Sequence, residues 1–156
     1  MTVALSITVP VAAPAAEVFA AATDWPGQGE WMLGTTVEAT AQGGVGVGGG
    51  ISAFTGVGRL GFLDTMVITR WEPPVRCDVL HTGRVVRGTG VFEVRPTGPA
   101  TSDFVWSEEL DLPLGALGRA GWVLVRPGFA LGVRLSLRRF ARWVEAGRPV
   151  AGRQSA

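Results

Sequence analysis

Several residue types that mark common classes of protein are scarce in this chain. Of its 156 residues only one is cysteine, Cys77, so no internal disulfide can form. Only one is histidine, which argues against a Cys/His zinc site or another metal site. Charged residues make up 17% and the net charge is +1, without the basic surface that nucleic-acid binding requires. We therefore expect no disulfide scaffold, no metal and no nucleic-acid partner.

Long apolar runs are missing too. Within residues 112–137, the most apolar stretch, three arginines and Pro127 interrupt the run before it reaches the ~20 residues of a membrane span. The N-terminal sequence MTVALSITVP has neither the basic region nor the long apolar core of a signal peptide. Together with the single thiol, which suits a reducing compartment, this predicts a cytoplasmic protein with no integral membrane segment.

Apolar residues and glycine are abundant instead. Hydrophobic residues make up 47% of the chain, and 23 residues are glycine. A chain of this length and composition can bury a core without covalent staples. We therefore expect one domain over residues 1–148, followed by a disordered tail at 149–156.

The apolar pattern predicts a strand, two short helices and then a series of strands. Residues 2–9 alternate apolar and polar side chains up to Pro10, as a half-buried strand does. A helix is expected after Pro14, broken at Pro26, with a short second helix as far as Met32. Strands are predicted at 35–41, 60–71, 75–82, 85–95 and 101–112, the last four as antiparallel neighbours joined by short turns.

A glycine-rich segment, GGVGVGGG, occupies residues 43–50. A phosphate-binding loop would have Lys and then Ser or Thr after its last glycine, whereas Ile51 and Ser52 follow here. A dinucleotide-binding loop would lead into a helix, whereas the following ISAFTGVGRLGF has the pattern of a strand. The segment is better explained as a bent hairpin whose glycines allow close approach to another element.

A long helix is predicted at the C-terminal end, over residues 127–146. Pro127 suits its start, and apolar residues recur at helical spacing. This stripe consists of Phe129, Val133, Leu137, Phe140 and Val144. Leu131 and Leu135 lie on the arginine-bearing side instead. We expect the apolar residues 114–126 to fold over them, and a homodimer contact is the alternative.

The order of these elements resembles the START-like superfamily, also called SRPBCC, and within it the polyketide cyclase/dehydrase and lipid-transport branch. The segments that carry the resemblance are VPVAAPAAEVFAAATDW, RWEPPVRCDVLHTG, DFVWSEELDLP and SLRRFARWVEAG, spread over almost the whole chain. The resemblance implies an α+β helix-grip fold: a curved antiparallel β-sheet wrapped around a long C-terminal α-helix, with two short helices after the first strand. It also implies a cavity for a small hydrophobic molecule, without a shared catalytic residue. We expect no cofactor.

Strand parity predicts which side chains face that cavity. The inner face of residues 101–112 carries Phe104, Trp106, Glu108, Leu110 and Leu112. A two-residue turn at 83–84 would place Val79 opposite Gly88, and the next turn would place Gly90 beside Glu108. Two inward-facing glycines would leave room for a ligand beneath the helix, unless a one-residue bulge reverses the faces.

Titratable residues on this face are candidates for proton transfer. A buried carboxylate such as Glu108 has a raised pKa and could hold a ligand hydroxyl or exchange a proton; otherwise it lies at the rim or pairs with an arginine. His81 would suit cyclisation or dehydration chemistry, although a lone histidine at a strand end more often makes a structural hydrogen bond. The two residues lie two strands and roughly 10 Å apart, too far for a direct hydrogen bond. Asp64 either enters the cavity or caps a loop.

The predicted ligand-binding residues follow from these faces. They are Asp64, Met66, Cys77, Val79, His81, Gly88, Gly90, Phe92, Trp106, Glu108, Leu110, Phe129, Val133 and Leu137. Cys77 is expected to be a small core residue, because no basic neighbour would activate its thiol.

Three functions fit these expectations. The first is a binding or carrier protein for a lipid, polyketide or aromatic metabolite. The second is a cyclase or dehydratase in which cavity shape, with Glu108 or His81 as the proton-transfer group, promotes the reaction. The third is a membrane-surface protein that docks through residues 114–139.

Overall fold

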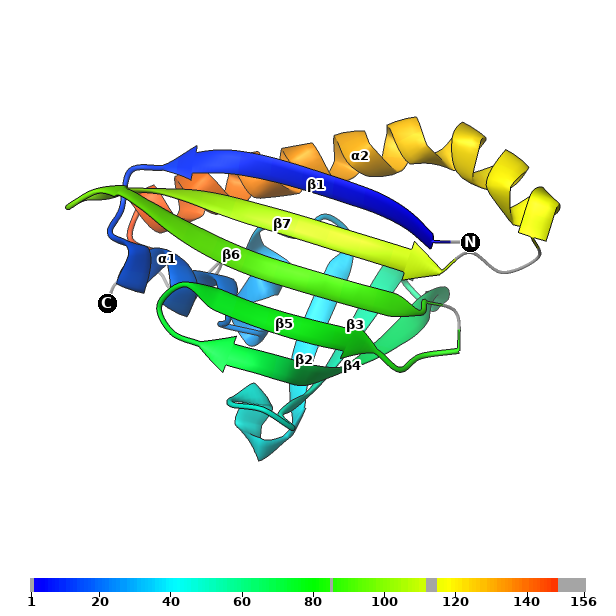
Figure 1. Ribbon diagram of the computed structural model, residues 1–156, viewed down its shortest axis with the longest axis horizontal. Coiled ribbons are helices and arrows are strands. Elements are labelled where there is room, and N and C mark those ends of the chain that lie inside the picture. Colours follow the sequence, from blue (N-terminus) through cyan, green and yellow to red (C-terminus); the bar gives the residue numbers. More distant parts are fainter. Residues whose placement is uncertain (1, 85, 112–114, 149–156) are drawn as a thin grey trace.

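The computed structural model describes residues 2–84, 86–111 and 115–148 (Figure 1). The chain forms β1 (Thr2–Val11), α1 (Ala15–Ala22), the 3-10 helix η1 (Pro26–Glu30), β2 (Thr35–Ala41), the 3-10 helix η2 (Gln42–Gly44), β3 (Gly50–Val57), β4 (Leu60–Glu72), β5 (Arg76–His81), β6 (Gly88–Gly98), β7 (Thr101–Asp111) and α2 (Gly115–Glu145). The strands form one antiparallel seven-stranded sheet in the order β1-β7-β6-β5-β4-β3-β2. Figure 1 shows this sheet curving beside α2, which confirms the predicted helix-grip fold.

The first strand is longer than predicted, because Pro10 does not end it. Pro10 pairs with Asp103 of β7, and β1 continues to Val11. β1 is at the edge of the sheet, where a residue without an N–H donor costs no ladder hydrogen bond on its open side. The side chains of Val9 and Val11 are both buried in the core.

The C-terminal helix also exceeds its predicted bounds. α2 starts at Gly115 and passes through Pro127, where a start was expected. Proline in a helix leaves the carbonyl four residues earlier without its donor, but Val123 is exposed and water can bond that carbonyl. Because residues 115–126 continue the same helix, the expectation that they fold over Leu131 and Leu135 was wrong. Both leucines are exposed.

The apolar stripe of α2 forms the core as predicted. Val133, Leu137, Phe140 and Val144 are buried, and Phe129 packs against them at the edge of the core. The Phe140 ring lies 4.7 Å from that of Phe104 on β7 and 4.9 Å from that of Trp31, measured between centroids. These aromatic contacts fix α2 against the sheet at its C-terminal half.

The pairing of β5 with β6 corrects the predicted register. β5 ends at His81 and β6 begins at Gly88, so the connection is longer than a two-residue turn. Val79 therefore lies opposite Gly90, where Gly88 was expected. The error is an even number of residues, so Val79 and His81 keep their predicted face. The predicted pairing of Gly90 with Glu108 across β6 and β7 is confirmed.

The glycine-rich segment approaches another element closely, as expected. Gly44 has a φ of +67°, and its carbonyl accepts a 2.8 Å hydrogen bond from Nε1 of Trp25. A Cβ atom at Gly44 would collide with the indole ring of Trp25. Glycine is thus required there both by the left-handed backbone and by the space available.

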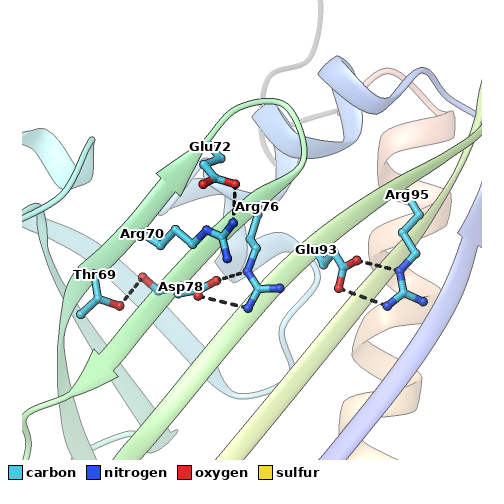
Figure 2. Close-up of polar contacts among 7 residues, drawn as sticks. All are labelled: Thr69, Arg70, Glu72, Arg76, Asp78, Glu93 and Arg95. Atoms are coloured by element: carbon cyan, nitrogen blue, oxygen red, sulfur yellow. Dashed lines mark hydrogen bonds and ion pairs between the residues drawn. The ribbon is translucent and has the colours of Figure 1, made fainter.

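The outer face of the sheet carries ion pairs between neighbouring side chains (Figure 2). Arg76 bonds Asp78 at 2.7 Å, and Arg95 bonds Glu93 at 2.7 Å. A third pair joins Arg70 to Glu72 at 2.8 Å. Pairs of this kind at a solvent-facing surface contribute little stability. Their value here is to show which face of β4–β6 meets water.

Candidate functional site

A cavity of about 300 Å³ lies between the concave face of the sheet and α2. It is lined by Trp25, Gln28, Met32, Leu33, Thr35, Val37, Ile51, Ala53, Thr55, Phe62, Met66, Cys77, Val79, His81, Val86, Gly90, Phe92, Trp106, Glu108, Leu110, Phe129, Gly132, Val133 and Ser136. Most of these side chains are apolar. Such a lining, with a few polar groups, is typical of a small-molecule site, and the volume lies at the lower end of the ~300–1,000 Å³ range of ligand pockets.

Eleven of the fourteen predicted residues line this cavity, and three do not: Asp64, Gly88 and Leu137. Leu137 is buried in the core on the side of α2 that packs against other apolar groups. Gly88 has a φ of +129°. A Cβ atom placed on it would point at the backbone of Glu109 and away from the cavity. Asp64 contacts Nδ1 of His81, on the side of the imidazole ring opposite to Glu108. Leu112, which was placed on the same face, lies outside the described residues.

Asp64, His81 and Glu108 form one buried chain of hydrogen bonds. Nδ1 of His81 lies 2.8 Å from Oδ2 of Asp64, and Nε2 of His81 lies 2.9 Å from Oε2 of Glu108. All three residues are buried. The predicted separation of His81 and Glu108 was therefore wrong, and Glu108 pairs with the imidazole where a rim position or an arginine was expected.

Gly90 explains why these two residues meet across an intervening strand. It lies on β6 between Val79 and Glu108, and a Cβ placed on it would be only 3.0 Å from Oε1 of Glu108. The missing side chain lets the Glu108 carboxylate and the His81 ring lean toward each other over the β6 backbone. The strand spacing of roughly 10 Å gave the distance between backbones and took no account of this gap.

Two opposing effects set the charge of the imidazole. Burial by itself lowers the pKa of His81, but the hydrogen bonds and negative charges of Asp64 and Glu108 outweigh it and raise the pKa to about 10. Burial is the main cause that raises the pKa of Glu108, and the interaction with His81 opposes it. At neutral pH the imidazole is thus a cation held between two acidic groups.

One oxygen of this chain is available to a ligand. Other polar side chains of the lining already have partners: Gln28 donates to the carbonyl of Ala22, Thr35 bonds Thr55, and Ser136 accepts from the Leu33 N–H. Both nitrogens of His81 are used. Oε1 of Glu108 has no hydrogen bond within the part of the chain that the structure describes, and Glu108 lines the cavity. The site can therefore accept a hydrogen bond, or a proton, from a molecule in the cavity.

Cys77 also lines the cavity, but its chemistry is that of a small apolar group. Burial raises the pKa of its thiol to about 12, with a smaller contribution from Asp78. The thiol is therefore protonated at physiological pH and is a poor nucleophile. Among the described residues, no three His, Cys, Asp or Glu side chains are grouped so as to hold a metal ion.

The wall formed by η1, β2 and β3 was missed by the sequence interpretation. It contributes Gln28, Val37, Ile51, Ala53 and Thr55. A signal for it was present, because Ile51, Ala53 and Thr55 alternate along one strand face, as do Thr35 and Val37. Pairing of β2 with β3 places Val37 opposite Ala53, which brings the two faces together.

The fold and the cavity define a helix-grip protein with an internal apolar site. A family model described as polyketide cyclase / dehydrase and lipid transport matches residues 2–145. The chain belongs to this family, which confirms the resemblance drawn from its sequence. No curated protein matches the chain.

Solved structures share the fold at low sequence identity. The protein TTHA0849 from Thermus thermophilus is 16% identical, with a TM-score of 0.78 over 94% of this chain and 100% of its own. The ZhuI aromatase/cyclase from Streptomyces sp. R1128 is 16% identical, with a TM-score of 0.77 over 97% and 99%. Norcoclaurine synthase from Thalictrum flavum, in complex with dopamine and hydroxybenzaldehyde, is 16% identical, with a TM-score of 0.68 over 96% and 90%. At this identity the likeness concerns the fold.

Proposed function

We propose that this protein binds a small, largely apolar molecule in its cavity, with a hydrogen-bond donor of that molecule on Oε1 of Glu108. The observation that carries the proposal is the contrast between an apolar lining and one carboxylate oxygen at its wall, Oε1 of Glu108, that has no hydrogen-bond partner among the described residues. A ligand that fills the cavity excludes water from this oxygen, so a ligand that donates to it makes both the hydrogen bond and the apolar contact, whereas one without a donor leaves the acceptor unpaired. A lipid, polyketide or aromatic metabolite with a hydroxyl or amine group has this chemistry.

The test uses a neutral apolar fluorophore, N-phenyl-1-naphthylamine, whose amine can donate to Glu108. We expect saturable binding with increased emission. Val79→Trp places an indole in the cavity and should weaken binding at least about tenfold, because the space beside Gly90 is then filled. Leu80→Trp is the matched control, since this neighbour of Val79 on β5 lies outside the cavity lining and is exposed. Equal binding by both variants would contradict the proposal.

Proton transfer is a second candidate function, favoured by the hydrogen-bonded arrangement of Asp64, His81 and Glu108. The family description includes cyclases and dehydrases. In such a reaction Oε1 of Glu108 takes a proton from a carbon next to a carbonyl, and the same carboxyl returns it to a hydroxyl that leaves as water. Asp64 holds the imidazolium of His81, which keeps the second carboxylate oriented. The shape of the cavity would hold a polyketide-like substrate in the bent conformation that the reaction requires.

Glu108→Gln separates this reaction from simple binding. The amide keeps the size of the side chain but cannot carry a proton, so an enzyme should lose about a hundredfold or more of its rate. The measurement is loss of water from a linear poly-β-keto thioester analogue, followed by mass spectrometry. Fluorophore affinity of the same variant controls for the shape of the site. Absence of turnover in the unmodified protein would leave binding as the function.

A further inference from the structure

Four segments converge at the end of the sheet where the cavity opens. β5 and the N-terminal part of β4 extend toward this end, since Met66 pairs with His81 and the β3–β4 turn lies further along β4. Gly88 pairs with Leu110, which brings the start of β6 and the end of β7 to the same place, just before α2. Phe62, Val86, Leu110 and Phe129 of these segments all line the cavity. Phe62 is 38% exposed, so the cavity meets solvent here.

The rim of this opening carries large apolar side chains that the described part of the chain leaves exposed. On the β3–β4 turn, Val57 is 84% and Leu60 85% exposed. On α2, Val123, Leu124 and Val125 are exposed by 70%, 82% and 59%. Successive helix residues are about 100° apart, so these three cover more than half of the circumference of the helix. A helix that is apolar on so many sides is normally covered by protein or lipid.

Arginines surround these apolar side chains. Arg59 lies on the β3–β4 turn, Arg84 between β5 and β6, and Arg126 on α2, and all three are exposed. Arg70, Arg76 and Arg95 of the outer sheet face are paired with carboxylates (Figure 2), but none of the three rim arginines has an ion pair among the described residues.

The acidic groups of this end point elsewhere. Glu109 and Asp111 alternate with the inward-facing Glu108 and Leu110, so they lie on the outer face of β7. Asp111 accepts a hydrogen bond from Thr2, and its N–H donates to the carbonyl of Arg87. The backbone of Arg87 thus lies next to Asp111 at the edge of this outer face, and Arg87 is left out of the rim. The rim itself is apolar and positive.

We propose that this rim docks on the surface of a membrane that contains anionic lipid. The rim consists of Val57, Leu60, Val123, Leu124 and Val125 together with Arg59, Arg84 and Arg126. Apolar side chains enter the boundary of headgroups and acyl chains while arginines bind phosphate groups, a combination typical of interfacial docking. A second copy of the chain carries the same positive charges and would face them across the contact, which disfavours it as the partner. No helix in the described part of the chain is long and apolar enough to cross a membrane.

Docking in this orientation directs the opening of the cavity at the lipid. An apolar molecule dissolved in the bilayer could then enter between Phe62 and Phe129 without crossing water. This consequence rests on the proposed binding function, whereas the docking itself does not. The two are separable, because vesicle binding needs no occupant of the cavity.

The experiment is vesicle flotation of the full chain. We expect the protein to float with vesicles of phosphatidylcholine and phosphatidylglycerol and to remain in the bottom fraction with vesicles of phosphatidylcholine alone. Added salt should release it from the anionic vesicles. Arg59→Gln should weaken the anionic-vesicle affinity about fivefold, and Leu60→Glu or Leu124→Glu at least about tenfold. Val79→Trp should float normally, which separates docking from cavity binding.

The matched control is Val45→Glu with Val47→Glu. Both valines are exposed but lie between β2 and β3, at the opposite end of β3 from the rim. This variant should float like the unmodified protein. Equal loss in the control, or no flotation with anionic vesicles, would overturn the proposal. So would a dimer in light scattering that Leu124→Glu or Leu135→Glu dissociates in the absence of vesicle binding, since the face would then be a subunit interface.

Discussion

Replacement of His81 by alanine should lower the free energy of unfolding by about 3–5 kcal/mol at pH 8, the largest stability effect that we expect of any single substitution here. The imidazole is bonded to Asp64 and Glu108, and without it two acidic groups face each other in a buried site. Each then loses its cationic partner and keeps its desolvation cost. Urea unfolding followed by tryptophan fluorescence measures the change.

The same variant should regain stability as the pH falls. Burial already raises the pKa of Glu108 and the imidazole opposes that rise, so without His81 the free energy of unfolding of the variant itself should be higher at pH 5 than at pH 8. Leu80→Ala is the control on the same strand; its side chain is exposed, and we expect a change within about 0.5 kcal/mol. A deficit below about 1 kcal/mol at pH 8 would show that the imidazole is not a buried cation.

Stability of the unmodified protein should fall as the pH rises from about 6.5. His81 has its pKa raised to about 10 in the folded protein and an ordinary pKa near 6.5 when unfolded. Its contribution is therefore fully present below pH 6.5 and is lost as the pH rises through 10. Between pH 6.5 and 8.5 the loss should be on the order of 2 kcal/mol, since one proton contributes at most about 1.4 kcal/mol per pH unit.

Composition makes this titration easy to assign. The chain has one histidine, no tyrosine and no lysine. Glu108 acts in the same direction but starts at lower pH: its raised pKa stabilises the folded protein below its ordinary value of 4.5, and this is lost as the pH rises. Cys77 contributes only above its ordinary pKa of 9.0. His81→Gln combined with Glu108→Gln removes both groups and should therefore flatten the profile between pH 6.5 and 8.5, and an unchanged slope in that double variant would assign it to another group.

The alternation of side chains along single strands was enough to predict several residues of the site. Parity along β7 placed Trp106, Glu108 and Leu110 on one face, and the structure has all three at the cavity. The register of β5 was wrong by two residues, yet Val79 and His81 still face inward, because the pleat repeats every two residues. The predicted faces of Val79 and His81 were therefore correct, although the predicted pairing of β5 with β6 was shifted by two residues.

The helix shows where pattern misleads. Pro127 normally marks a helix start, and the sequence around it predicted one. In the structure α2 passes through it, because that part of the helix lies beyond the core and water can replace the lost donor. Whether proline ends a helix depends on what surrounds the carbonyl it leaves unpaired, and only the tertiary structure determines that.

The sequence by itself determined the order of strands and helices, the inward faces and the family, because these depend on periodicity and turn residues within short stretches of chain. It did not determine that Asp64, His81 and Glu108 meet. That contact joins three strands through a gap left by Gly90, and it depends on sheet curvature and on side chains leaning across a neighbouring strand. Distances between residues far apart in the chain arise only when the sheet closes around α2.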